Sequence, residues 1–281
     1  MKTSKQPTLQ ESMKMLSEMT LLDRFLFSET MSDPEAYTAT LQIILGQEKL
    51  KLLAPPQAER EVKTTPWLRS IRLDVYAVNE EGTVYDTEMQ AQPRNDLRRR
   101  SRYYQSLIDS SLLSPGTRDF NELKDVYVIM IMPFDLFGLD KYFYTFVPTC
   151  KEEKTLELED GAIRIFLNTR GKNDDEITPE LKAFLRYVES PDGEFVEKSG
   201  SDRLKKIHAC VNRVKLSEEA GVRFMRHWIE RIEYLEEGRA ESLLESIRNL
   251  METLQLTEEQ AMAALKIPEE ERGKYAEMLK R

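Results

Sequence analysis

The sequence is poor in the residues that build disulfide frameworks and most transition-metal centres. Its 281 residues include only two cysteines and two histidines. Cys150 and Cys210 can form one disulfide at most, which excludes a small disulfide-stapled fold and a cysteine-rich zinc site. His208 and His227 lack neighbouring ligands at the spacings typical of zinc enzymes. We therefore interpret all four as structural or surface residues.

Long hydrophobic runs are missing as well. The longest, near Val126–Pro133, is far shorter than the roughly 18 residues that a transmembrane helix needs. The segment Met1–Gln10 is polar and has no apolar stretch of the kind found in secretory signals. We therefore expect a cytoplasmic protein with no membrane partner. GxxxxGK[ST], HExxH and GxSxG motifs are also absent, which excludes P-loop, zincin and serine-hydrolase chemistry.

The charge balance is acidic, with 41 Lys and Arg against 50 Asp and Glu and a net charge of −9. Residues 229–281 carry 13 of the acids and only 8 of the bases, so over half of the excess lies near the C-terminus. Hydrophobic residues make up 40% of the chain, which is typical of a folded domain rather than a disordered one. An acidic chain is a poor passive coat for nucleic acid, but it can still carry a local basic groove.

The hydrophobic pattern predicts an α/β fold with a mostly helical C-terminal extension. Asp33 and Pro34 are typical of a helix start, and Gly46 of its end. The predicted strands are Glu59–Thr65, Ile71–Val78, Thr83–Gln90, Val126–Met132, Tyr142–Val147, Thr155–Leu158 and Ile163–Leu167. The predicted helices include Asn95–Leu113, Pro179–Val188, a long Leu204–Leu254, one capped by Thr257 and one after Pro268. We divide the chain into an N-terminal arm (1–30), an α/β domain with a β-rich extension (31–200) and a helical region (201–281).

Two acidic residues stand out on consecutive strands. A three-residue loop, Glu80-Glu81-Gly82, pairs Asn79 with Thr83 and sets Asp74 opposite Glu88 on one face of the hairpin. Facing carboxylates destabilise a sheet by themselves, whereas a hard cation such as Mg²⁺ binds them favourably. The spacing alone is equally compatible with a solvated hairpin face.

The residues around this pair resemble the recombination-promoting nucleases, also described as PD-(D/E)XK nuclease family transposases. The resemblance rests on four groups of residues that extend over about residues 20–200. They are Arg69-Ser-Ile-Arg-Leu-Asp74-Val with Tyr85-Asp-Thr-Glu88-Met-Gln90; Arg100-Ser-Arg-Tyr-Tyr104-Gln; Leu22-Asp23-Arg-Phe25-Leu-Phe27; and Val128–Gly138 with Leu167–Lys172.

The resemblance implies a PD-(D/E)XK restriction-endonuclease-like core and a DNA endonuclease that uses Mg²⁺ or another divalent cation. In that scheme Asp74, Glu88 and the main-chain carbonyl of Met89 bind the ion. Gln90 replaces the usual lysine of the third motif position. A glutamine can orient a water molecule, but it is no general base at neutral pH.

Some positions depart from the family pattern. Gln42 stands where many members carry Glu or Asn, so we consider Glu59 and Asp23 as additional acids, and Arg69 replaces a common lysine. These departures favour an alternative, in which the fold is catalytically inactive and serves as a DNA-binding or partner-binding accessory. Recombination, transposition and defence against invading DNA all remain open as biological roles.

A basic run follows Gln90. Arg94, Arg98 and Arg102 are spaced by four residues and are predicted to form one stripe on a helix. Such a stripe beside an acidic site suits DNA phosphates, although most arginine stripes are simply solvated. The acidic, amphipathic C-terminal helices instead favour a homo-oligomer or a protein partner.

Overall fold

The computed structural model describes residues 7–62 and 71–279, which form two compact units. One unit spans Leu9–Gly221 and contains a six-stranded sheet, and the other contains the chain from Val222 onward. The expected boundaries at residues 30 and 200 do not coincide with this division. Leu16 and Leu21 are completely buried, and helix α7 packs on α1, α2 and α3. The segments on both sides of the expected α/β domain therefore belong to its core.

The sheet is mixed and has the order β1-β2-β3-β4-β6-β5. Its strands are β1 (Gln57–Val62), β2 (Ile71–Val78), β3 (Val84–Met89), β4 (Val126–Met132), β5 (Phe143–Phe146) and β6 (Ala162–Asn168). The pairs β3–β4 and β4–β6 are parallel and the other three are antiparallel. The predicted α/β class is confirmed, and the continuous apolar run Val126–Met132 is the buried central strand that its sequence predicts.

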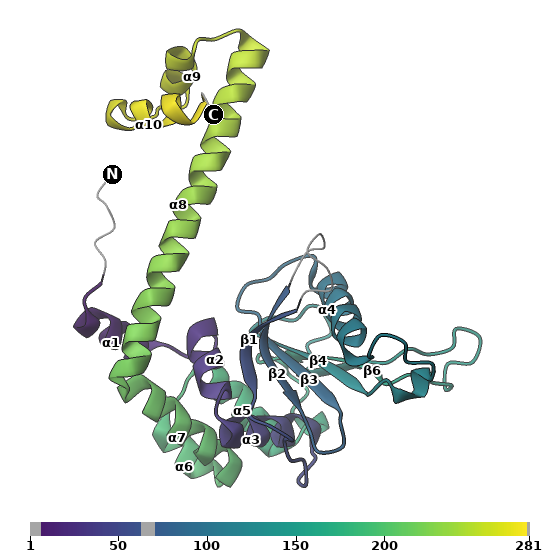
Figure 1. Ribbon diagram of the computed structural model, residues 1–281. Helices are drawn as coiled ribbons and strands as arrows, with labels where there is room; N and C mark the ends of the chain where they lie inside the picture. The colour runs from purple at the N-terminus through teal and green to yellow at the C-terminus, as the bar shows by residue number, and fades with distance from the viewer. Residues whose placement is uncertain (1–6, 63–70, 280–281) are drawn as a thin grey trace. The chain divides into compact units, whose positions relative to one another are not determined.

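Helices cover both faces of this sheet (Figure 1). The helices of the sheet unit are α1 (Leu9–Glu18), α2 (Arg24–Met31), α3 (Pro34–Leu45), α4 (Leu97–Leu112), α5 (Pro179–Glu189), α6 (Gly193–Ser199) and α7 (Asp202–Leu216). Helix α4 connects β3 to β4 and packs on one face through Leu97, Tyr104 and Ile108. Helix α3 covers the other face, where the Tyr37 hydroxyl lies 2.7 Å from the Thr87 hydroxyl.

Local signals in the sequence account for most of the helix ends. Asp33 caps α3 through the N–H groups of Glu35 and Ala36, Pro34 occupies the first turn, and Gly46 ends the helix at φ +66°. Thr257 forms the predicted capping box with Gln260. The long predicted helix Leu204–Leu254 is in fact two helices, because the Ser217 hydroxyl accepts from Ala220 N–H and starts a new one.

Two strand predictions need correction. Thr155–Leu158 forms no strand, only an isolated bridge between Glu157 and Thr149, because it lies in a loop with no neighbouring strand to pair with. The expected strand Glu59–Thr65 begins earlier, at Gln57, and its last residues lie outside the described part of the chain. Arg69 also lies outside the described residues.

The second unit has a small core of its own. Helix α8 (Glu218–Leu254) enters it at Val222, and α9 (Glu258–Ala264) and α10 (Glu269–Leu279) follow. Its buried cluster consists of Ala240, Leu244, Ile247, Ala261, Met262, Ile267 and Tyr275. No helix among the described residues combines the length and hydropathy needed to cross a bilayer.

Candidate active site

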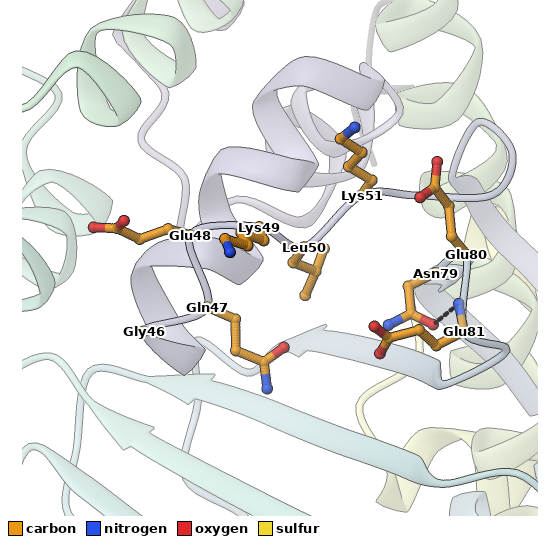
Figure 2. Close-up of a pocket in the computed structure, with 9 residues that line it drawn as sticks. All are labelled: Gly46, Gln47, Glu48, Lys49, Leu50, Lys51, Asn79, Glu80 and Glu81. Atoms are coloured by element: carbon orange, nitrogen blue, oxygen red, sulfur yellow. Dashed lines mark hydrogen bonds between the residues drawn. The ribbon is translucent and has the colours of Figure 1, made fainter.

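The β2–β3 hairpin has the predicted register. Its paired residues are Val75 with Thr87, Tyr76 with Asp86, Ala77 with Tyr85 and Val78 with Val84. The loop is the expected three-residue one: Asn79 N–H donates to Thr83 O, and Gly82 adopts φ +91°. The Asn79 side chain adds bonds from Glu81 N–H at 3.1 Å and Thr83 N–H at 2.8 Å, the first of which is drawn in Figure 2. The next position in this register sets Asp74 against Glu88.

The two carboxylates replace main-chain pairing at this position. Asp74 N–H donates to Glu88 Oε1 at 2.8 Å, and Met89 N–H donates to Asp74 Oδ2 at 3.0 Å. Each side chain therefore reaches across to the other strand and is held by a backbone amide. Asp74 is 2% exposed and Glu88 is 3% exposed, so both acids are set into the sheet rather than solvated on it.

The remaining oxygens of the pair face two arginines. Arg24 Nε lies 2.7 Å from Asp74 Oδ1, and Arg100 Nη2 lies 3.1 Å from Glu88 Oε2. Arg100 also donates from Nη1 to Gln90 Oε1 at 3.2 Å and from Nε to the Tyr104 hydroxyl at 2.6 Å. One guanidinium thus connects Glu88, Gln90 and Tyr104, and places Gln90 on the face predicted for it.

A third carboxyl group lies on the same face. Asp86 precedes Glu88 by two residues on β3 and is completely buried. Neither of its oxygens has a hydrogen-bond partner among the described residues. Burial, followed by the charges of Glu88 and Asp74, raises its pKa well above the usual value. Burial therefore favours the neutral form of Asp86, which lies next to two other acids whose pKa values are also raised.

Burial is also the largest influence on the pKa values of Asp74 and Glu88. It raises the pKa of Asp74, although Arg24 acts in the opposite direction. It raises the pKa of Glu88 to about 8, with the Asp74 charge adding to the rise and Arg100 opposing it. Desolvation of a carboxylate outweighs one guanidinium partner at each acid. The site is therefore short of positive charge.

The other candidate acids lie elsewhere in the geometry. Glu59 falls between the β1–β2 pairs Ala58–Val75 and Arg60–Leu73, beside Asp74, but its backbone adopts φ +51° and its side chain lies 3.8 Å from Arg72. Asp23 caps α2 by accepting from the N–H groups of Phe25 and Leu26. The residue after it, Arg24, is the one that reaches Asp74. Gln42 donates to the carbonyls of Glu48 and Leu50 and so holds a loop.

The arginines of the basic run are not one stripe. Helix α4 begins at Leu97, so Arg94 precedes it and instead pairs with Asp96 at 3.0 Å. Arg98 donates to Leu136 O at 2.8 Å and lies over the Phe137 ring, while Arg102 is exposed. The expectation of a three-arginine helical stripe is wrong, because Arg94 lies before the first turn of α4.

A hollow of about 670 Å³ adjoins the acid pair. It is lined by Arg24, Ile71, Arg72, Arg94, Asp96, Arg99, Arg100, Tyr103 and Tyr104. Five of these nine residues are arginines and one is an acid, although the whole chain has a net charge of −9. Sequence reasoning missed Arg24, Arg99 and Arg72 as a group, because they come from three separate elements.

A second hollow of about 630 Å³ lies at the other end of the hairpin, between residues 46–51 and 79–81. Its charged side chains, Glu48, Lys49, Lys51, Glu80 and Glu81, do not converge on a common point (Figure 2). Of these two hollows, only the arginine-lined one adjoins buried acids.

The family model of the PD-(D/E)XK nuclease family transposases matches residues 24–227 of the chain. The chain belongs to this family. The match covers the whole sheet, the acid pair and its two arginines, and it confirms the resemblance seen in the sequence. Neither the curated proteins nor the solved structures include one that matches the chain.

Membership of the PD-(D/E)XK family supports a nuclease- or transposase-related function. Because such nucleases typically use divalent cations, the site must be tested for suitable ligands. Among the described residues, no three or more His, Cys, Asp and Glu side chains are arranged around a common point for a metal. The donor set nevertheless fits such an ion in kind. Asp74 and Glu88 offer adjacent carboxylate oxygens, which hard cations prefer, at a position where burial already calls for positive charge.

Proposed function

We propose that this protein is a metal-dependent DNA endonuclease that hydrolyses phosphodiester bonds. The observation that carries the proposal is the pairing of Asp74 with Glu88 across β2 and β3, with each carboxylate held by a backbone amide of the opposite strand. A fold gains nothing in stability from two buried acids side by side, so their retention is best explained by chemistry.

The chain's own residues divide the work as follows. Asp74, Glu88 and the Met89 carbonyl would hold the cation, and backbone amides already fix both carboxylates. When bound, Mg²⁺ or a similar ion lowers the pKa of a coordinated water and stabilises charge on the phosphate. Gln90, fixed by Arg100, orients the attacking water through its amide. Glu59 lies beside Asp74 and makes the site more negative.

The family's substrate class implies DNA as the partner. Arg94, Arg98 and Arg102 remain proposed phosphate contacts, and Arg94 has the strongest support because it lines the hollow beside the acids. The C-terminal unit is proposed to serve self-association or a protein partner, since its exposed charges are mostly acidic.

A second candidate function is a catalytically inactive, DNA-binding or partner-binding accessory. The observation in its favour is that Arg24 and Arg100 already contact the outer oxygens of the acid pair, beside a glutamine in place of the usual lysine. In this case the arginines replace the cation permanently.

Plasmid nicking separates the two. An endonuclease nicks supercoiled DNA with Mg²⁺, stops with EDTA and loses activity in Asp74→Ala. DNA binding without nicking under any divalent cation, unaffected by EDTA, would instead establish the accessory function.

A further inference from the structure

Two arginines line the hollow and also contact the acid pair. Arg24 contacts Asp74, and Arg100 contacts Glu88. The side chain of Arg24 is 43% exposed and that of Arg100 is 25% exposed, whereas the carboxylates beneath them are almost fully buried. The two guanidiniums therefore form the floor of the hollow and the cover of the acids.

The contacts favour the outer oxygens of the two carboxylates as the ligands of a shared cation. One oxygen of each carboxylate accepts a backbone N–H, from Met89 or Asp74, and the other oxygen contacts a guanidinium. A divalent ion shared by the two acids needs those outer oxygens. Its charge would also repel a guanidinium a few ångströms away, because charges close to a protein interior are weakly screened. Ion and arginines compete for the same ligands.

The hollow offers the displaced arginines another partner. Guanidinium groups bind phosphate oxygens through paired hydrogen bonds as readily as they bind carboxylates. Arg72 and Arg99 also line the hollow without contacting Asp74 or Glu88, so they can attract an anion before any exchange takes place. Once a phosphodiester is bound there, the arginines turn to it and the carboxylates become available to the ion.

We propose that the hollow is a phosphodiester-binding pocket, and that its occupation transfers Arg24 and Arg100 from the carboxylates to the phosphate, so that DNA and the divalent cation increase each other's affinity. The mutual increase follows from linkage: an exchange that helps the ion bind in the presence of DNA must help DNA bind in the presence of the ion. This inference rests on the proposed nuclease function. It adds that the ion binds poorly to the free protein.

The test measures Mn²⁺ binding rather than cleavage, from the free-ion signal in electron paramagnetic resonance. Full-length protein is titrated alone, with a short phosphorothioate duplex at saturation, and with inorganic phosphate; duplex without protein corrects for Mn²⁺ on DNA. We expect the duplex to raise the affinity of the wild type for Mn²⁺ by about 5- to 150-fold, the usual range of coupling between two sites.

Variants assign the effect to the pocket. Arg24→Gln with Arg100→Gln removes the competing cations, so Mn²⁺ binds tightly without DNA and the duplex adds little. Because that variant leaves buried acids unneutralised and can fail to fold, Arg72→Gln with Arg99→Gln is tested beside it. This second pair spares the acids and should reduce the coupling at least several-fold. Arg118→Gln, an exposed arginine in the loop after α4 and outside the hollow, is the matched control and keeps the coupling.

An unchanged Mn²⁺ affinity in the presence of duplex would overturn the exchange even if the protein nicks DNA. A rise with inorganic phosphate but none with duplex would overturn the assignment of DNA as the ligand. If Mn²⁺ binds under none of these conditions, and does not bind the variant Arg24→Gln with Arg100→Gln either, the proposed function itself would be overturned.

Discussion

The two units of this protein bury different kinds of residues. The core of the C-terminal unit contains Ala, Leu, Ile, Met and one Tyr, with the charges left on its surface. The sheet unit buries Asp74, Asp86 and Glu88 in its centre, next to completely buried Leu73 and Val128. Each buried carboxyl group costs stability unless it is paired or neutral. The described part of the second core contains no charged residue, which is consistent with the proposal that the acids in the sheet serve chemistry rather than folding.

The largest expected effect comes from removing one charge of the pair. Asp74→Asn keeps the shape of the side chain, and should lower the nicking rate by more than about 100-fold, the upper limit typical of mutations in the outer shell of metal sites. The melting temperature should stay the same or rise, because repulsion with Glu88 disappears. Glu245→Gln, on the exposed surface of α8, is the matched control and should change neither quantity. Undiminished nicking by Asp74→Asn would show that the pair is not catalytic.

The second-largest effect is expected in the pH dependence of stability, which should differ between the two units because, among the described residues, only the sheet unit buries acids. The pKa of Glu88 is about 8 in the folded protein, against 4.5 for an ordinary solvated glutamate, so the folded protein holds a proton that the unfolded chain releases. The stability that this bound proton adds to the folded protein is complete below pH 4.5 and is lost as the pH rises through 8. The raised pKa values of Asp74 and Asp86 change the stability in the same direction. Thermal unfolding of the sheet unit should therefore shift to lower temperature between these values. Glu88→Gln should flatten that slope, and a slope that survives this change would assign it to other groups.

A smaller effect is expected from the arginines at the surface. Replacing Arg94, Arg98 or Arg102 by glutamine should lower the slope of log K against log salt for DNA binding by about one for each phosphate that the variant no longer binds. We expect the largest change at Arg94, which lines the hollow, and the smallest at Arg98, which is bound to Leu136 O. Equal slopes in all three variants and the wild type would show that DNA phosphates contact none of these three arginines.

The smallest effect on chemistry is expected from removing the C-terminal unit. A chain that ends at Glu237 loses every residue of the second core but none of the sheet. Nicking and its dependence on Mg²⁺ should persist, while the oligomeric state measured by light scattering can change. A folded truncation without nicking would mean that the second unit completes the site.

The register of the hairpin could be predicted from sequence because it depends on local chemistry. A loop with glycine at the left-handed position fixes every later pair, so Asp74, Glu88 and Gln90 follow from Gly82. The same parity places Asp86 on the acid face. Only burial, which depends on helix α4, shows that Asp86 is cut off from solvent.

The arginines could not be predicted in the same way. Arg24 follows a helix cap and carries no local signal that it contacts a strand much later in the chain. Arg100 precedes Tyr104 by one helical turn. This spacing places the guanidinium beside the hydroxyl, and it is the one local signal in the sequence for the position of Arg100. The sequence pattern pointed instead to Arg94, Arg98 and Arg102, because regular spacing is easier to recognise than convergence from separate elements.

The three-residue loop of the hairpin also has a consequence for the order of folding. Closing so short a loop costs little entropy and takes microseconds, whereas docking α2 against the sheet closes a much longer one. We therefore expect the hairpin to bring Asp74 and Glu88 together before Arg24 docks against them. During that interval, turn hydrogen bonds such as those of Asn79 must hold two repelling acids in place. A local turn thus brings the two acids together, whereas Arg24 contacts Asp74 from a separate helix.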